Sequence, residues 1–242
     1  ATKIERALRV AQLWCDEGDG KSAAASAERV LCWDPNEPEA LTLLVRLYRE
    51  AGALARAIGV LEHAAAAATD PASRLELLRR VLALLPAEDH RARFDLLRRL
   101  LTLSDRDPAV LAELRETAAA GNLWPEMAAL LTHLACLNES DEARLVVRRA
   151  LAEIYETRLA QPARALVVLQ SALLAPALDG ELRVELGRLA RLTGRQEELL
   201  AVLDRLATAE FPLAARKTAL LERAAVAEQE LDDRVRAFAE LR

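Results

Sequence analysis

Aromatic residues are scarce in this 242-residue chain, at 3% of the sequence, although hydrophobic residues make up 52% of it. Leucine and alanine therefore supply most of the apolar surface, and both are strong helix formers. The β-branched and aromatic residues that favour strands are few. This composition predicts an all-α protein with enough apolar material for a core.

Cysteine is also rare, and neither sign of charge dominates strongly. The three cysteines, Cys15, Cys32 and Cys136, each lie in an apolar helical run, so we expect reduced, buried thiols and a cytoplasmic protein. The formal net charge of −5 provides no field that would attract nucleic acid or an anionic membrane. We therefore expect no nucleic-acid partner.

Long uncharged apolar runs are missing: no stretch reaches the roughly 18 residues of a membrane span, so we expect no membrane insertion. A signal-peptide pattern is missing too. The chain begins at Ala1 within a helical pattern and stops as abruptly, which is typical of a fragment of a longer protein. Its many arginines, few lysines and high alanine content favour a GC-rich, bacterial genome.

Gly20-Lys21-Ser22 matches the end of a phosphate-binding P-loop, G-x-x-x-x-G-K-[ST]. The first glycine of that motif is replaced by Cys15, and the preceding residues have helical rather than strand spacing. We therefore do not expect phosphate binding, and a glycine-containing turn between two helices needs another explanation.

An internal repeat provides that explanation. Residues 39–66 contain two helical stripes separated by Gly52: Leu41, Leu44, Val45 and Tyr48, then Ala57, Leu61 and Ala64. Thirty-four residues earlier the same places hold Ala7, Val10, Ala11, Trp14, Gly18, Ala23, Ala27 and Val30. This pattern resembles the tetratricopeptide repeat, a helix-turn-helix unit of about 34 residues. Small residues there let the helices approach closely, while Trp14 and Tyr48 would fill the groove against the next unit.

The resemblance implies an all-α, right-handed α-solenoid of stacked antiparallel helix pairs, with about thirteen to fourteen helices in one array over residues 1–242. The expected units are 4–37, 38–71, 72–106, 107–142, 143–179, 180–213 and a truncated 214–242. A gapless overlay of 143–170 on 215–242, with identities such as Ala152/Ala224, supports the later units. Their turns, "RLAQPA" and "ELDDRV", depart from the pattern because they lack glycine. An irregular helical bundle is the alternative.

The sequence offers little for catalysis or metal binding. His133 and Cys136 lie three residues apart, but a zinc site needs three or four ligands, so we expect core packing and no metal or cofactor. The acidic pairs Glu88-Asp89 and Asp232-Asp233 precede helices, where carboxylates cap free N–H groups. No nucleophile elbow, dinucleotide loop or H-E-x-x-H motif occurs, so we expect no catalytic residues and no enzyme.

The resemblance implies that the first helix of each unit lines a concave, partner-binding groove. The predicted groove residues are Gln12, Arg46, Arg49, Arg80, Arg115, Glu153, Arg188 and Arg191. Because guanidinium groups bind carboxylates in bidentate fashion, we expect an acidic segment or a carboxylate terminus as the ligand. Alternatively, these arginines are solvated or paired with Glu of neighbouring units. The Lys and Asn residues of the family's chaperone-tail clamp have no counterparts at these places.

The predicted function is a non-enzymatic scaffold or adaptor that docks a partner protein or acidic peptide in its groove, within a bacterial assembly for motility, secretion or signalling. The alternatives are an RNA-binding helical repeat, since pentatricopeptide repeats have nearly the same length, and a substrate-presenting domain of a larger enzyme. End-to-end self-association through apolar helix faces at the ends of the fragment is a further expectation.

Overall fold

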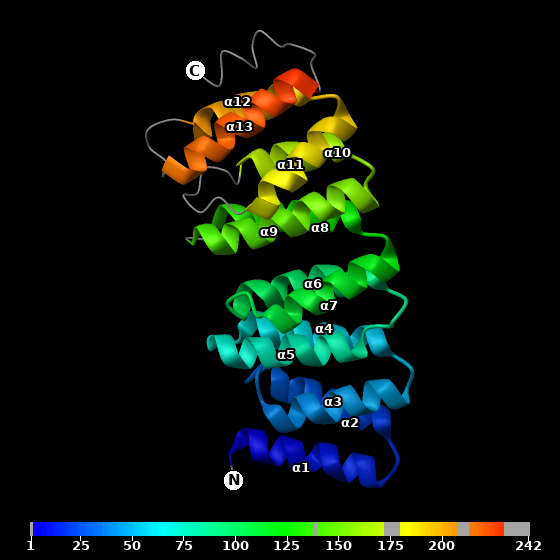
Figure 1. Cartoon of the computed structure of the whole chain (residues 1–242). Helices are drawn as coiled ribbons and strands as arrows, with labels where there is room; N and C mark the ends of the chain where they lie inside the picture. The colour runs from blue at the N-terminus through cyan, green and yellow to red at the C-terminus, as the bar shows by residue number, and fades with distance from the viewer. Residues whose placement is uncertain (1, 138–139, 172–179, 208–212, 230–242) are drawn as a thin grey trace. The chain divides into compact units, whose positions relative to one another are not determined.

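The computed structural model of the chain describes residues 2–137, 140–171, 180–207 and 213–229. Within these ranges the chain forms thirteen α-helices and one π-helical turn, η1, and contains no β-strand (Figure 1). The α-helices are α1 Lys3–Asp16, α2 Gly20–Leu31, α3 Pro38–Glu50, α4 Leu54–Ala67, α5 Pro71–Leu84, α6 His90–Leu103, α7 Pro108–Gly121, α8 Trp124–Leu137, α9 Asp141–Glu153, α10 Pro162–Gln170, α11 Gly180–Thr193, α12 Gln196–Leu206 and α13 Leu213–Gln229. The prediction of an all-α helical-repeat fold is confirmed.

The chain divides into two compact units, Ala1–Leu123 with α1 to α7 and Trp124–Arg242 with α8 to α13. Inside each unit, every helix packs against the next helix along the chain, which is the local contact pattern of repeat proteins. The expected repeat 107–142 contains α7 of one unit and α8 of the other. One continuous array over residues 1–242 stays a prediction.

Alanines form the helix crossings at the start of the first unit. Ala11, Ala24 and Ala27 are buried together with Leu44 and Tyr48. Because alanine has no side chain beyond Cβ, it lets α1, α2 and α3 pack closely around the larger residues. Tyr48 therefore lies in the core as expected.

Trp14 does not take the equivalent place in the first repeat, so that expectation is wrong. Its side chain is 37% exposed and that of Val10 is 45% exposed, while α1 buries Leu8 and Ala11. The reason is that α2 covers Tyr48, whereas no described helix covers the corresponding side of α1.

Aspartates begin several helices as N-caps. Asp89 accepts a hydrogen bond from the Ala92 N–H at 3.0 Å, which confirms its expected role, whereas Asp232-Asp233 lie outside the described residues. At α2, the Asp19 carboxylate accepts from the N–H groups of Lys21 and Ser22 at 3.2 and 3.1 Å. The Ser22 hydroxyl also donates to the Asp19 carboxylate, at 2.6 Å. This side-chain hydrogen bond, followed by the backbone ones, lowers the pKa of Asp19. A carboxylate thus occupies the helix N-terminus where a P-loop would hold phosphate.

The backbone conformation of the turns explains why some of them contain glycine, and shows what replaces glycine in a turn that lacks it. Gly18, Gly52 and Gly194 have φ of 81°, 68° and 67°, in the left-handed region that favours glycine. In the turn "RLAQPA", which lacks glycine, Ala160 adopts φ 51°, two residues after the π-helical turn Ile154–Arg158 ends. The other turn without glycine, "ELDDRV", lies outside the described residues. At this turn the departure from the repeat pattern is therefore a longer connection in which alanine takes the left-handed conformation.

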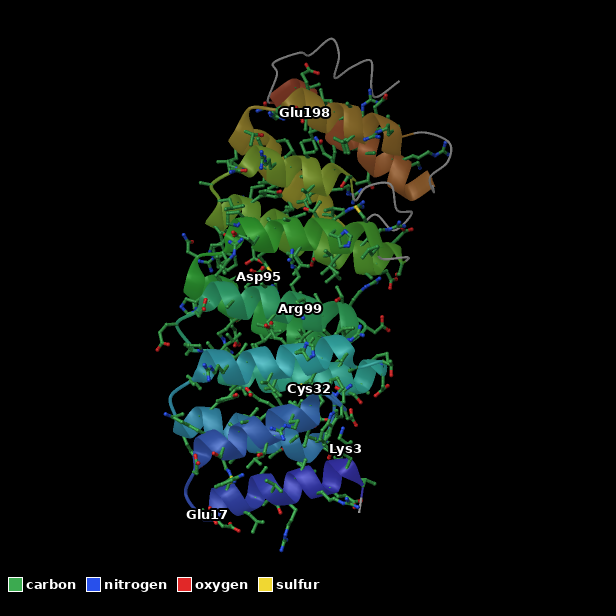
Figure 2. All side chains as sticks on the ribbon, turned by 180° about the vertical axis from the view of Figure 1, so that it is seen from behind. Lys3, Glu17, Cys32, Asp95, Arg99 and Glu198 are labelled. Atoms are coloured by element: carbon green, nitrogen blue, oxygen red, sulfur yellow. The ribbon has the colours of Figure 1, made fainter. Side chains whose placement is uncertain are left out.

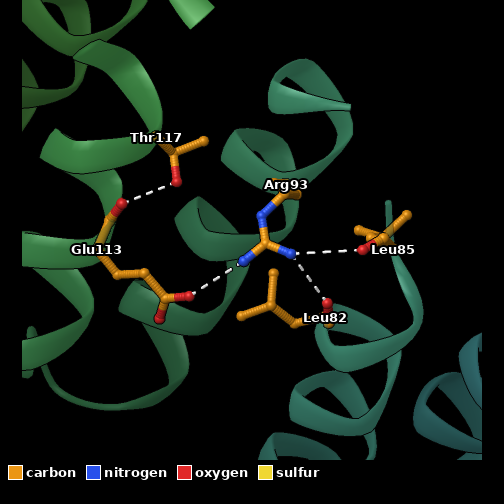
Figure 3. A network of polar contacts seen from close by, with 5 residues as sticks. All are labelled: Leu82, Leu85, Arg93, Glu113 and Thr117. Atoms are coloured by element: carbon orange, nitrogen blue, oxygen red, sulfur yellow. Dashed lines mark hydrogen bonds and ion pairs between the residues drawn. The ribbon is translucent and has the colours of Figure 1, made fainter. Parts of the chain in front are cut away.

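An arginine joins three helices in the first unit (Figure 3). From α6, Arg93 Nη1 donates to the carbonyl oxygens of Leu82 at 3.2 Å and Leu85 at 3.5 Å, at the C-terminal end of α5. Its Nη2 contacts Glu113 Oε1 of α7 at 3.4 Å, and Thr117 donates to the Glu113 backbone carbonyl at 2.8 Å. The cation therefore satisfies helix-terminal carbonyls that lack intrahelical partners.

The expected burial of His133 and the cysteines is wrong. Cys32, Cys136 and His133 are exposed and Cys15 is half-buried; all three cysteines are free thiols. The apolar side of α8 that packs into the core carries residues such as Leu131 and Leu134, and His133 and Cys136 fall on the other side of the helix. Of the helices in the described ranges, none combines the length and apolar character needed to cross a membrane.

Candidate functional site

A cleft of about 650 Å³ lies between α1 and α3 in the first compact unit. Its apolar lining comes from Leu8, Pro38 and Leu43, and its polar lining comes from Gln12, Cys15, Asp16, Glu39, Thr42 and Arg46. Two of the predicted groove residues, Gln12 and Arg46, are therefore brought together here.

The local sequence builds both walls in the same way. Leu8 and Gln12 on α1, and Glu39 and Leu43 on α3, are four residues apart and share one side of their helix. Because α1 and α3 are the first helices of successive repeats, these sides border one cleft. Leu8 and Leu43 were not among the groove residues predicted from the sequence. A count of four residues back from Gln12 would have found Leu8, and a count of four residues on from Glu39 would have found Leu43.

Arg46 is the cation of this cleft. Its Nη2 lies 3.9 Å from the Cys15 sulfur, which is a weak acceptor. Among the described residues, no carboxylate forms an ion pair with Arg46. The guanidinium group is therefore available to bind a carboxylate from outside the chain. Asp16 and Glu39 place negative charge elsewhere along the cleft.

The other predicted groove residues of the first unit do not line this cleft. Arg49 on α3 and Arg115 on α7 are exposed, and Arg80 on α5 is half-buried. In the second unit, Glu153 on α9 is exposed. Their role in binding stays a prediction.

Arg188 on α11 is already paired. It forms a bidentate ion pair with Glu156 of η1, at 2.5 and 2.7 Å. The pair lowers the pKa of Glu156 and raises the pKa of Arg188, mainly through these hydrogen bonds. Arg191 donates from Nε to the Gly187 carbonyl at 3.0 Å and borders a separate pocket of about 250 Å³. For Arg188 the structure therefore shows the alternative expectation, in which the arginine is paired with a Glu of a neighbouring helix pair instead of facing an open groove.

Two further pockets lie along α2, away from the first cleft, and share a wall of Glu28, Tyr48 and Arg56. The Tyr48 hydroxyl donates to Glu28, which links α3 to α2. Burial, followed by this hydrogen bond, raises the pKa of Tyr48 to about 12. Sequence reasoning missed this contact because the two residues are in different repeats.

The smaller of these pockets, about 390 Å³, is also lined by Cys32 and His63. Two such side chains are too few for a stable zinc site. Across the described part of the chain, no three His, Cys, Asp or Glu residues come together as a metal site would require.

Comparison with known proteins finds a repeat family that matches part of the chain. The family described as Tetratricopeptide repeat matches residues 16–80. No curated protein sequence matches the chain. Among solved structures, a tetratricopeptide repeat protein from Parabacteroides merdae ATCC 43184 is 15% identical, with 98% of this chain and 90% of that one covered and a TM-score of 0.36.

Two other solved structures are similarly distant. The TPR2AB-domain:pHSP90-complex of yeast Sti1 is 13% identical, with coverage of 97% and 98% and a TM-score of 0.34. A thermophilic TPR protein from Thermus thermophilus is 21% identical, with coverage of 98% for both chains and a TM-score of 0.27. At such identities and TM-scores, no ligand or partner transfers from these proteins to this chain.

Proposed function

We propose that this chain, whose residues 16–80 match the tetratricopeptide repeat family, is a non-enzymatic docking module built from such repeats. Proteins with this fold generally mediate protein–protein interaction and are generally not catalysts. The proposed ligand is an extended segment of a partner protein that places an acidic side chain, or its terminal carboxylate, in the cleft between α1 and α3.

The position of Arg46 carries this proposal. The guanidinium group lies in a cleft with Leu8 and Leu43 and has no carboxylate partner among the described residues. A planar guanidinium group matches a carboxylate with two parallel hydrogen bonds, and the leucines can bury an adjacent apolar side chain. The volume, about 650 Å³, suits a few residues of an extended peptide.

The two acidic residues of the cleft would restrict the sequence of the ligand. Asp16 and Glu39 repel a second carboxylate and favour a neutral or basic neighbour. The preferred segment therefore contains one acidic residue next to an apolar one, rather than a run of acidic residues.

The cellular setting that we propose is a bacterial, cytoplasmic multiprotein assembly in which the chain serves as scaffold or adaptor. Its support is compositional: arginine greatly exceeds lysine, alanine is abundant, and the three cysteines are free thiols.

A peptide array tests the proposed ligand. Immobilised extended peptides that pair one Asp or Glu with a neighbouring apolar residue are probed with the 242-residue chain, and the dissociation constants of retained peptides are then measured by calorimetry. Arg46→Glu should weaken the best peptide by at least tenfold, because a hydrogen bond to a charged group contributes about 1.5–3 kcal/mol. Arg29→Glu is the matched control, since Arg29 is exposed on α2 and does not line the cleft.

The two variants separate the cleft from a general charge effect. Equal loss in both variants would show that the net charge of the chain, rather than the cleft, controls binding. Unchanged affinity in Arg46→Glu would refute the role of Arg46. A photo-crosslinking residue at Thr42 should mark the bound peptide, because Thr42 lines the same cleft.

A further inference from the structure

One side of α1 carries a stripe of residues that the cleft does not use. Spaced by three or four positions along the helix, these residues are Lys3, Arg6, Val10, Leu13, Trp14 and Glu17. Val10, Leu13 and Trp14 are 45%, 51% and 37% exposed. No other helix in the described ranges exposes three large apolar side chains.

The next repeat shows what kind of surface this is. Thirty-four residues later, α3 carries Leu44 and Tyr48 in place of Val10 and Trp14. Leu44 is fully buried and Tyr48 is 6% exposed, because both pack against alanines of α2. The corresponding side of α1 therefore has the apolar pattern of a helix–helix interface, and no described helix lies on it.

The N-terminal end of the stripe differs from that interface, however. Arg6 stands where α3 has Ala40, which is fully buried with Leu8 and Val30. A helix packed on α1 as α2 packs on α3 would enclose the Arg6 charge without a partner, which is unfavourable. The occupant of this face must therefore offer a carboxylate to Arg6.

A second copy of α1 meets this requirement. Lys3 and Glu17 lie at opposite ends of the helix (Figure 2), so the stripe is positive at its N-terminal end and negative at its C-terminal end. The Lys3 ammonium lies over the Trp33 ring, 3.8 Å from its centroid, which leaves Arg6 as the cation for an intermolecular contact. No ion pair within the described ranges engages Arg6 or Glu17.

The spacing of the stripe fits an antiparallel pairing. The midpoint between Arg6 and Glu17 along the helix falls inside the segment 10–14, which holds the three exposed apolar residues. A two-fold axis at this point places Arg6 of each copy opposite Glu17 of the other and brings both apolar segments together. Such a contact is isologous, because the same surface is used by both copies.

We propose that this chain forms a two-fold symmetric dimer through antiparallel packing of its α1 helices. The contact joins the same end of two copies, and so differs from end-to-end stacking of repeats. It leaves the cleft between α1 and α3 accessible, since Leu8 and Gln12 lie on another side of the helix. The dimer proposal and the peptide-binding proposal are therefore independent, and each can be refuted without the other.

Sedimentation equilibrium of the 242-residue chain tests the dimer. We expect association in the micromolar range and at least a hundredfold weakening by Val10→Glu. Val146→Glu should change the association little; it alters a valine of α9 that is 68% exposed, against 45% for Val10. Leu13→Glu is a second variant of the face, and circular dichroism verifies that each variant folds. A dimer that persists unchanged in both Val10→Glu and Leu13→Glu would place the interface elsewhere and overturn the proposal.

Charge reversal tests the antiparallel geometry. Arg6→Glu places a carboxylate opposite Glu17 of the other copy, and Glu17→Arg places a guanidinium group opposite Arg6 of the other copy. Each variant alone should therefore dimerise at least tenfold more weakly. Mixed together, the two variants should form a heterodimer with affinity close to that of the unaltered chain. Failure of the mixture to associate would refute the antiparallel arrangement.

A chain that is monomeric throughout the concentration range would overturn the dimer. Titration of that monomer with a synthetic peptide of residues 19–33, which include α2, would then assign the occupant. Binding of the peptide would show that the face accepts a repeat-like helix of another molecule instead of a second α1.

Discussion

Two glycine-to-alanine substitutions in the first unit should change stability in opposite directions. Gly59 lies inside α4 and Gly121 is the last residue of α7, and neither has a positive φ. Alanine is favoured over glycine in a helix interior by up to about 1 kcal/mol. Helix propensity alone would therefore predict that both substitutions stabilise the chain.

The surroundings of the two glycines reverse one of these effects. A Cβ atom at Gly59 would have no neighbour within 4 Å, whereas a Cβ at Gly121 would lie 2.5 Å from His90 Cβ and 3.2 Å from His90 Cγ. The His90 Cβ is attached directly to the backbone at the start of α6, so relief of the overlap must move α6 relative to α7. Overpacking of this kind costs about 1–3 kcal/mol.

Combining the two effects, Gly59→Ala should stabilise the first unit by about 0.5–1 kcal/mol and Gly121→Ala should destabilise it by about 1–2 kcal/mol. Urea unfolding followed by circular dichroism and by tryptophan emission measures both changes, and Trp14 and Trp33 report on this unit. Equal denaturant slopes show that the unfolding transition itself is unchanged. If Gly121→Ala stabilises the chain as much as Gly59→Ala does, the close approach of α6 and α7 does not require glycine.

Three further predictions concern conformation and ionisation. Ala160→Gly should stabilise the second unit by about 1 kcal/mol and so raise its urea midpoint, because glycine adopts the left-handed conformation without strain, and an unchanged midpoint would contradict the strain. Ultraviolet titration of tyrosinate should show a late step near pH 12 that Tyr48→Phe removes. Because the pKa of Tyr48 is raised from 10, the stability that the protonated hydroxyl contributes should be lost as the pH rises from 10 through about 12. Because the pKa of Glu156 is lowered, its ion pair should stabilise the second unit above about pH 4.5, and this stability should be lost as the pH falls through the pKa of the folded state. In acid titrations followed by circular dichroism, Arg188→Gln should remove this part of the pH dependence.

Helix positions were predictable because their signals are local. The apolar spacing around Leu41 and Leu44, the turn at Gly52 and the cap at Asp89 each depend on residues within one or two helical turns. The thirty-four-residue recurrence of this pattern then indicated stacked helix pairs. For the candidate site, the same periodicity selected Gln12 and Arg46, which the structure brings to one cleft.

Other parts of the site depend on neighbours that a periodic pattern does not reveal. The repeat pattern predicts equivalent places for Arg46 and Arg188, but of these two residues only Arg188 forms an ion pair with a glutamate, on η1. That glutamate, Glu156, belongs to a π-helical turn whose geometry the sequence pattern did not indicate. Equivalent positions therefore differ in whether their charge is available to a partner.

The sequence by itself determined that the chain is helical and where turns such as the one at Gly52 and caps such as Asp89 lie, because hydrophobic spacing, capping and glycine turns act over a few residues. Only the tertiary structure decided which equivalent residues are covered. Trp14 and Tyr48 have the same place in the repeat, yet Tyr48 is buried by α2 and Trp14 remains partly exposed. The physical reason is that burial and ion pairing depend on what lies opposite a side chain, and in a repeat protein the opposite surface comes from a different repeat.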